Sequence, residues 1–149
     1  MSTIQSLNID VDGLRVGSGQ LTTEGGNVLI GNSLVVGGTI VPRMIAVSDG
    51  TSITANSDIA DIVFQNNTQV AGILTINAPL GTPLNGQKLI YRIQSTNAQT
   101  FSWNAAVFGG SSDIALPTTT TGSGKFDYVG FLYNTAASKW QILAKNFGF

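Results

Sequence analysis

The chain has 149 residues, of which 10% are charged and 42% are hydrophobic, and its net charge is -1. It contains neither cysteine nor histidine, which excludes structural disulfides and any thiolate or imidazole chemistry. The basic residues are few and scattered, so there is no electrostatic footprint for nucleic acid. Because a typical soluble domain has about 25% charged residues, the sparse charge indicates that partner chains cover part of this surface.

The N-terminal residues MSTIQSLNID lack the basic and apolar segments of a secretory signal. No part of the chain has the run of about 18 apolar residues that a membrane-spanning helix needs, because glycine and asparagine interrupt every candidate. We therefore expect a soluble protein that is made in a cytoplasm and has no membrane partner.

Residues 1–42 are predicted to form an N-terminal β-arm that serves oligomerisation or attachment. The stretch GGNVLIGNSLVVGGTI, residues 25–40, carries no charge, and its apolar residues come in short bursts that glycine or asparagine ends. Strands this short cannot bury a face alone and gain stability by packing against neighbouring chains. The density of β-branched residues disfavours the alternative, a disordered arm. The predicted oligomer interface consists of Val28, Leu29, Ile30, Leu34, Val35, Val36 and Ile40.

Residues 43–149 are predicted to form an antiparallel β-sandwich or jelly-roll-like domain, so the fold class is all-β. Short runs of alternating apolar and polar residues follow one another, with turn signals such as Asn85-Gly86 and Gly109-Gly110 between them. The alternation puts three sets of residues each on one face of a strand: Leu89, Tyr91 and Ile93; Val129, Phe131 and Tyr133; Trp140, Ile142 and Ala144.

Aromatic side chains gather in the C-terminal half of the chain. They could line a sugar-binding groove, but aromatic residues of strands more often pack in a core, and we favour the core. They are Phe101, Trp103, Phe108, Tyr128, Phe131, Tyr133 and Trp140.

Two loops have weak likenesses to ligand-binding motifs. The GSGK sequence at 122–125 lacks the first glycine of a phosphate-binding loop, which would fall at Thr119, and Phe126 replaces the metal-binding hydroxyl. Asp10 and Asp12 offer oxygen ligands to calcium, but the closing glutamate of an EF-hand loop is missing. A hairpin turn and a polar turn are the favoured interpretations, unless sister chains complete a calcium site.

Paired carboxylates could hydrolyse glycosides if they were held about 5–10 Å apart. Asp58 and Asp61 are the nearest pair in sequence, while Asp113 and Asp127 lie elsewhere. Residues three apart in a strand point to opposite faces, which weakens the first pair. We therefore predict that the protein is not an enzyme and has no catalytic, cofactor-binding or metal-binding residue and no cofactor.

From Asn85 onward the sequence reads NGQKLIYRIQSTNAQTFSWNAAVFGGSSDIALPTTTTGSGKFDYVGFLYNTAASKWQILA. The order of its short motifs resembles a C-terminal module of tailed-bacteriophage virion proteins: N-G-x-x-L-x-x-R-I, then T-x-x-W, ALPTTT, an aromatic strand ending YN, and SKWQILA. The resemblance covers residues 84–145, somewhat under half of the chain. The N-terminal NVLIGNSLVVGGTI is similar to units of phage fibre and appendage proteins that form intertwined trimeric β-structure.

This resemblance implies a homotrimer with a structural role and transfers no catalytic residue. The short length favours a capsid decoration (cement) protein on the outer surface of the virion, which would bind the major capsid protein or another virion protein. The fibre-like units favour the alternative, a short tail fibre or fibre tip that binds a host-surface receptor or glycan. In both cases assembly takes place in the host cytoplasm.

Overall fold

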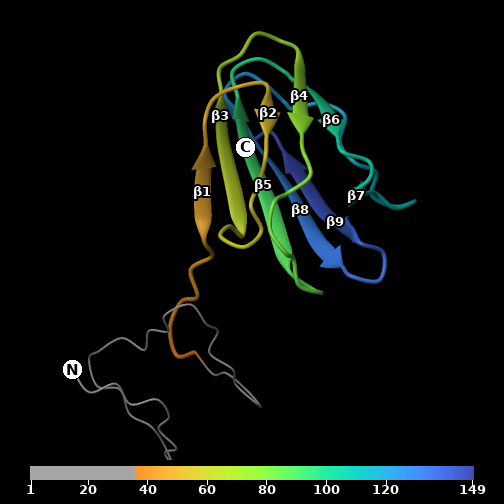
Figure 1. The fold of residues 1–149 in the computed structure, drawn as a ribbon. Coiled ribbons are helices and arrows are strands. Elements are labelled where there is room, and N and C mark those ends of the chain that lie inside the picture. The colour runs from red at the N-terminus through yellow and green to blue at the C-terminus, as the bar shows by residue number, and fades with distance from the viewer. Residues whose placement is uncertain (1–35) are drawn as a thin grey trace, which may run out of the picture. The chain divides into compact units, whose positions relative to one another are not determined.

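The structure is a computed structural model that describes residues 36–149. These residues contain nine strands and no helix (Figure 1). The strands are β1 (Met44–Val47), β2 (Ser52–Ile53), β3 (Ile62–Asn67), β4 (Ile73–Ile76), β5 (Lys88–Ser95), β6 (Thr100–Trp103), β7 (Phe108–Gly109), β8 (Lys125–Asn134) and β9 (Lys139–Phe147). They belong to a compact unit that spans Ile40–Phe149. The division that we predict between residues 42 and 43 stays a prediction, because most of the arm lies outside the described residues.

The strands form two sheets, and the chain passes from one sheet to the other at each step from β1 to β7. The large sheet has the order β1-β3-β5-β8-β9-β7, and the small sheet has the order β2-β4-β6 (Figure 1). Strands two apart in sequence therefore return to the same sheet in the same direction. Their pairing is parallel for β1/β3, β3/β5, β2/β4 and β4/β6.

The predicted mostly-β character is confirmed, whereas the predicted antiparallel pairing holds only for part of the domain. Antiparallel ladders join β5 to β8 and β8 to β9, and β7 pairs with β9 in parallel. The sequence alternation in single strands reports which face is buried, but it carries no information on the direction of the neighbouring strand. For this reason the alternation does not predict the parallel pairs of this domain.

The core lies between the two sheets and receives side chains from both. Leu89, Tyr91 and Ile93 of β5 are fully buried, as the alternation predicts, and they share the core with Leu74 and Ile76 of β4. The centre of the core is aromatic. The Tyr91 ring lies 5.9 Å from Trp103, 5.9 Å from Phe108 and 6.0 Å from Phe131, measured between centroids. Trp103, Phe108 and Phe131 therefore pack in the core as predicted. Tyr128 is the exception, because it alternates with the buried Asp127 and Val129 and so lies on the outer face of β8, against the Phe149 ring.

One predicted face changes partway along β9 because of a β-bulge. Phe131 pairs with Ile142, but the preceding Gly130 pairs with Ala144, so one extra residue, Leu143, is inserted in β9. Trp140 and Ile142 are buried as predicted, whereas Ala144 is exposed on the other face. The prediction that Ala144 shares their face is wrong for this reason.

A buried carboxylate fixes the end of the domain. The Asp127 side chain has no solvent exposure and accepts hydrogen bonds from the Thr121 backbone N–H (2.6 Å), the Thr121 hydroxyl (2.7 Å) and the Gly148 N–H (3.0 Å). It thus ties the loop before β8 to the chain after β9. Within residues 36–149 no helix is long and apolar enough to cross a membrane.

Candidate functional site

The predicted oligomer interface falls largely outside the part of the chain that the structure describes. Five of its residues lie there: Val28, Leu29, Ile30, Leu34 and Val35. The other two are described, and Val36 is 43% exposed while Ile40 is 71% exposed. Within residues 36–149 these two side chains are therefore left largely uncovered, and their role in an interface stays a prediction.

The start of β1 is held by a side-chain clip next to these residues. The Arg43 guanidinium donates hydrogen bonds to both carboxylate oxygens of Asp61, at 2.7 and 3.1 Å, and to the backbone oxygen of Asp58 at 2.6 Å. The Arg43 backbone N–H also donates to Asp61, at 2.9 Å. The side-chain hydrogen bond from Arg43 is the main reason that the pKa of Asp61 lies below its ordinary value. The clip therefore fixes where the chain joins the large sheet.

The acidic residues that we weighed for catalysis make structural contacts. Asp61 is engaged by Arg43, and Asp58 accepts a hydrogen bond from the Thr82 N–H at 2.8 Å. Asp113 lies within 3.3 Å of the Ser112 hydroxyl on an exposed loop. In the described range no group of three or more acidic side chains could hold a metal ion, and Asp10 and Asp12 lie outside it.

The GSGK loop at 122–125 is a tight turn before β8. Gly122, Ser123 and Gly124 all have positive φ angles, and a Cβ on Gly122 would lie 2.6 Å from the Ala98 backbone nitrogen. The Ser123 N–H donates to the Thr96 carbonyl at 2.9 Å. Gly122 therefore serves the close approach of two backbone segments, whereas Gly124 has open space around it and serves only the positive φ of the turn.

An apolar row crosses the outer face of the large sheet. The ladder registers align five residues from β1 to β9: Met44, Ile62, Ile90, Gly130 and Ala144. Met44 is 55% exposed, Ala144 is exposed, and the three between them are half-buried. An apolar row that runs across five strands and stays open in the described chain is typical of a surface that a partner covers.

The neighbouring row carries a cation held between aromatic rings. The Arg92 guanidinium carbon lies 4.9 Å from the Phe64 ring centroid and 4.5 Å from that of Phe126. These cation–π contacts hold the charge flat against the sheet, and Arg92 forms no salt bridge within the described chain. The outer face of the large sheet thus combines an apolar row and aromatic rings with the masked charge of Arg92, and it carries the exposed Lys88 at the start of β5.

The outer face of the small sheet is polar by contrast. Ser52, Thr75 and Ser102 form one row across β2, β4 and β6. Beyond them, the Asn77 side-chain amide donates to the Thr54 hydroxyl at 2.9 Å. Rows of hydroxyl and amide groups at strand spacing offer donors and acceptors to polar ligands such as sugars.

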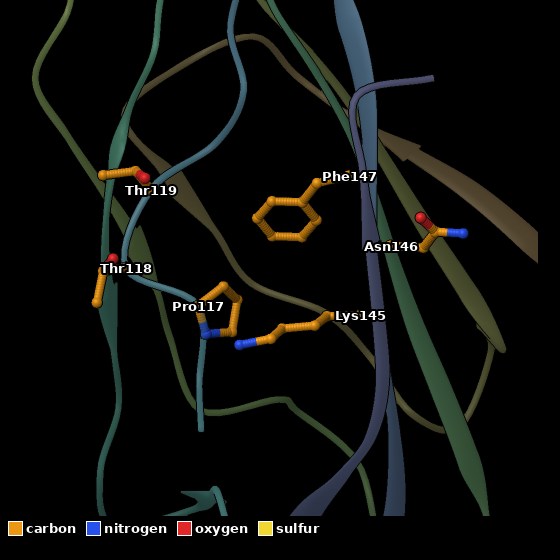
Figure 2. Close-up of a pocket in the computed structure, with 6 residues that line it drawn as sticks. All are labelled: Pro117, Thr118, Thr119, Lys145, Asn146 and Phe147. Carbon is orange, nitrogen blue, oxygen red and sulfur yellow. The ribbon is translucent and has the colours of Figure 1, made fainter. Parts of the chain in front are cut away.

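A hollow of about 400 Å³ opens between β9 and residues 117–119. Figure 2 shows the Phe147 ring and the Lys145 side chain on the side of β9 that faces Pro117, with Asn146 on the opposite side. The Lys145 ammonium donates to the Ala115 carbonyl at 3.0 Å. The hollow therefore combines an aromatic ring with a lysine stem whose charge already has a partner.

Strict alternation in the sequence does not indicate this hollow. Strict alternation from Trp140 puts Lys145 outside, and only the bulge at Leu143 turns Lys145 and Phe147 inward. The available signal is the apolar triplet Ile142-Leu143-Ala144, because three consecutive apolar residues break the alternation of a half-buried strand.

Comparisons with protein-family models, with curated proteins and with solved structures find no match to this chain.

Proposed function

We propose that this chain is a non-enzymatic structural protein of a tailed-bacteriophage virion, and that it forms a homotrimeric capsid decoration (cement) protein that stabilises the head. The observation that supports a covered, assembled protein best is the apolar row Met44, Ile62, Ile90, Gly130 and Ala144 on the outer face of the large sheet. The low content of charged residues agrees with it, since 10% leaves little repulsion between chains.

In this proposal, residues 43–149 act as a sandwich-like head and the arm supplies the trimer contacts. Three arms associate through the apolar bursts at residues 28–30 and 34–36, together with Ile40. Burial of such side chains contributes roughly 25 cal/mol per Å² of apolar area. The outer face of the large sheet then contacts the major capsid protein or another virion protein.

Light scattering on the purified full chain tests the trimer, and a monomer at micromolar concentration contradicts it. Replacing Leu34 and Val36 by aspartate is expected to dissociate the trimer, because buried carboxylates without partners oppose association. The matched control replaces Ala136 and Ala137, which are exposed in the turn between β8 and β9, by aspartate, which leaves the trimer intact.

The virion location is tested by labelling the protein on intact particles. A decoration protein covers the shell in many copies, binds expanded capsids and raises the temperature at which they rupture. Labelling confined to one vertex, without capsid binding, contradicts the decoration role.

The second candidate is a short tail fibre or fibre tip that binds a host-surface glycan. The polar rows on the outer face of the small sheet favour it, because hydroxyl and amide side chains can hydrogen-bond sugar hydroxyls. The full chain should then bind host cells and block infection. Replacing Thr75 and Ser102 by alanine should abolish that binding, whereas the same change at Thr118 and Thr119 should not.

A further inference from the structure

One edge of β9 is open over most of its length. The strand pairs with β8 along its whole course, but β7 pairs only with Trp140 and Gln141 on the other side. Beyond Gln141, no other strand of the described chain lies against this edge. An open edge presents unpaired backbone N–H and C=O groups to which a further strand can add.

The backbone direction at this edge follows from the ladder with β8. The Gly148 N–H donates to the Phe126 carbonyl at 3.1 Å, so Gly148 faces β8. Because alternate residues of an antiparallel strand face the same neighbour, the N–H groups of Lys145 and Phe147 point away from β8 and toward the open edge.

The same stretch of β9 is uncovered on both faces. Four consecutive residues, 143–146, are exposed, and Leu143 is 52% exposed. A strand with one face on the core exposes every second residue at most, namely the residues of its outer face. Here the inner side opens into the hollow in front of Phe147 (Figure 2).

We propose that a stretch within residues 25–40 of a second copy of this chain adds as an extended strand to the open edge of β9 at Leu143–Phe147. The apolar side chains on one face of this strand enter the hollow, and those on the other face make the contacts between arms. The inference rests on the homotrimer of the proposed function and names the surface that receives the arm. Strand addition joins main-chain hydrogen bonds, which give affinity, to pockets for alternate side chains, which give specificity.

The chemistry of the hollow fits this occupant. Residues 25–40 carry no charge and have apolar bursts of three residues, each too short to bury a face alone. Of the residues that line the hollow, only Lys145 is charged, and its ammonium already donates to Ala115. An uncharged, apolar strand can therefore enter without leaving a charge unpaired.

The positions of the two sheet edges favour a second copy over the same chain. The chain enters the large sheet at β1, which lies at the edge opposite β9 and β7 (Figure 1). If the β1 edge of one copy faces the β9 edge of the next, the arm that precedes β1 lies close to the open edge of β9 in the next copy. Such a head-to-tail contact uses two different surfaces and closes into a ring when the rotation fits, as it does in a trimer.

Photo-cross-linking of the full chain tests the inference. Phe147 is replaced by p-benzoylphenylalanine, which reacts with the groups that occupy the hollow, and the products are separated on a denaturing gel and mapped by mass spectrometry. The control carries the same group at Leu84, which is 69% exposed on a loop. We expect a link between two chains that maps to residues 25–40. A link within one chain, a link to other residues, or a yield no higher than at Leu84 overturns the proposal.

Two substitutions at one position test the backbone part of the inference. Lys145→Pro removes an N–H that points to the open edge and leaves the β8 ladder bonded, whereas Lys145→Ala keeps that N–H. We expect the cross-link from position 147 to fall to the Leu84 background with proline and to persist with alanine. Equal yields in both variants contradict strand addition. Near-ultraviolet circular dichroism reports whether the core around Trp140 stays folded, and if the proline variant loses it, the cross-link of the parent chain decides.

The outcomes separate this inference from the proposed function. A trimer by light scattering without the inter-chain link leaves the function standing and overturns the strand addition. A monomer overturns both.

Discussion

β5 and β9 have similar compositions, yet β5 has a neighbouring strand on each edge and a buried inner face, whereas one edge of β9 is open. β5 pairs with β8 along its full length and with β3 from Ile90 to Ser95, and its inward residues have no solvent exposure. β9 pairs fully only with β8 and exposes four consecutive residues. The two strands differ in their neighbouring strands and not in their hydrophobicity. An exposed apolar strand can therefore be well formed and still lack a neighbour along one edge.

The largest expected effect separates the two strands directly. Leu89→Ala in β5 leaves a cavity in a fully buried site and should lower the free energy of unfolding by about 4 kcal/mol. Lys145→Ala in β9 should lower it by less than about 1 kcal/mol, because that side chain is exposed. Urea unfolding of both variants, followed by tryptophan fluorescence, measures the difference. Equal losses would mean that β9 is as enclosed as β5.

The second prediction concerns the turn that closes the sheet before β8. Gly122→Ala should lower the free energy of unfolding by about 3 kcal/mol, because its φ is +74° and the new Cβ would lie 2.6 Å from the Ala98 nitrogen. The control Gly124→Ala has a similar φ of +70° but open space around it, and should lose about 1 kcal/mol. Thermal unfolding of the two variants separates the cost of the contact between the new Cβ and the Ala98 backbone from the cost of the positive φ. Indistinguishable variants would show that the 97–98 backbone yields freely.

The third prediction concerns the end of β9. The Asp127 carboxylate of β8 holds the chain there, where no second strand of the described chain pairs with β9. Asp127→Asn keeps the shape but weakens three accepted hydrogen bonds, and should lower the free energy of unfolding by about 1–3 kcal/mol. The amide of Gly148 should then exchange faster with solvent in hydrogen-exchange mass spectrometry. Asp113→Asn on an exposed loop is the control and should change neither quantity.

The smallest effect is expected at β1, the strand at the opposite edge of the large sheet. The depressed pKa of Asp61 means that its carboxylate favours the folded state above the unfolded pKa, which is about 3.9. This contribution is lost as the pH falls through the lower, folded pKa. Because the Arg43–Asp61 pair is exposed, it is worth less than about 1 kcal/mol. Urea unfolding of Arg43→Ala should show a loss at pH 7 that becomes smaller as the pH falls below about 3.9. The part due to the hydrogen bond from Arg43 to the Asp58 carbonyl remains in acid, and a loss that does not change with pH contradicts the ion-pair origin.

The sequence predicted the buried faces of β5 and β8 well. Leu89, Tyr91 and Ile93 alternate with polar or outward residues over eight positions, and Val129 and Phe131 do the same, so one face had to be buried. Alternation reports which face of a single strand is buried. It predicts these two strands well because β5 and β8 keep one register against each other from end to end.

The open edge and the hollow could not be predicted in this way. They depend on where β7 stops beside β9, which lies far from it in the chain, and on the insertion of Leu143 in the β8–β9 hairpin, which departs from strict alternation. The parallel pairing of β1, β3 and β5 has the same origin. The apolar bursts at residues 28–36 did indicate a missing partner, but they carry no information on the surface that receives them.

The alternation of the chain between two sheets has a consequence for the order of folding. The β8–β9 hairpin is joined by only the residues between Asn134 and Lys139, so it can close quickly, whereas each parallel pair must wait for a long crossover to close. During synthesis, however, β8 and β9 leave the ribosome after the other seven strands. The inner face of β5 packs with Val129 and Phe131 only then, so we expect the earlier strands to remain exposed to aggregation until β8 has emerged.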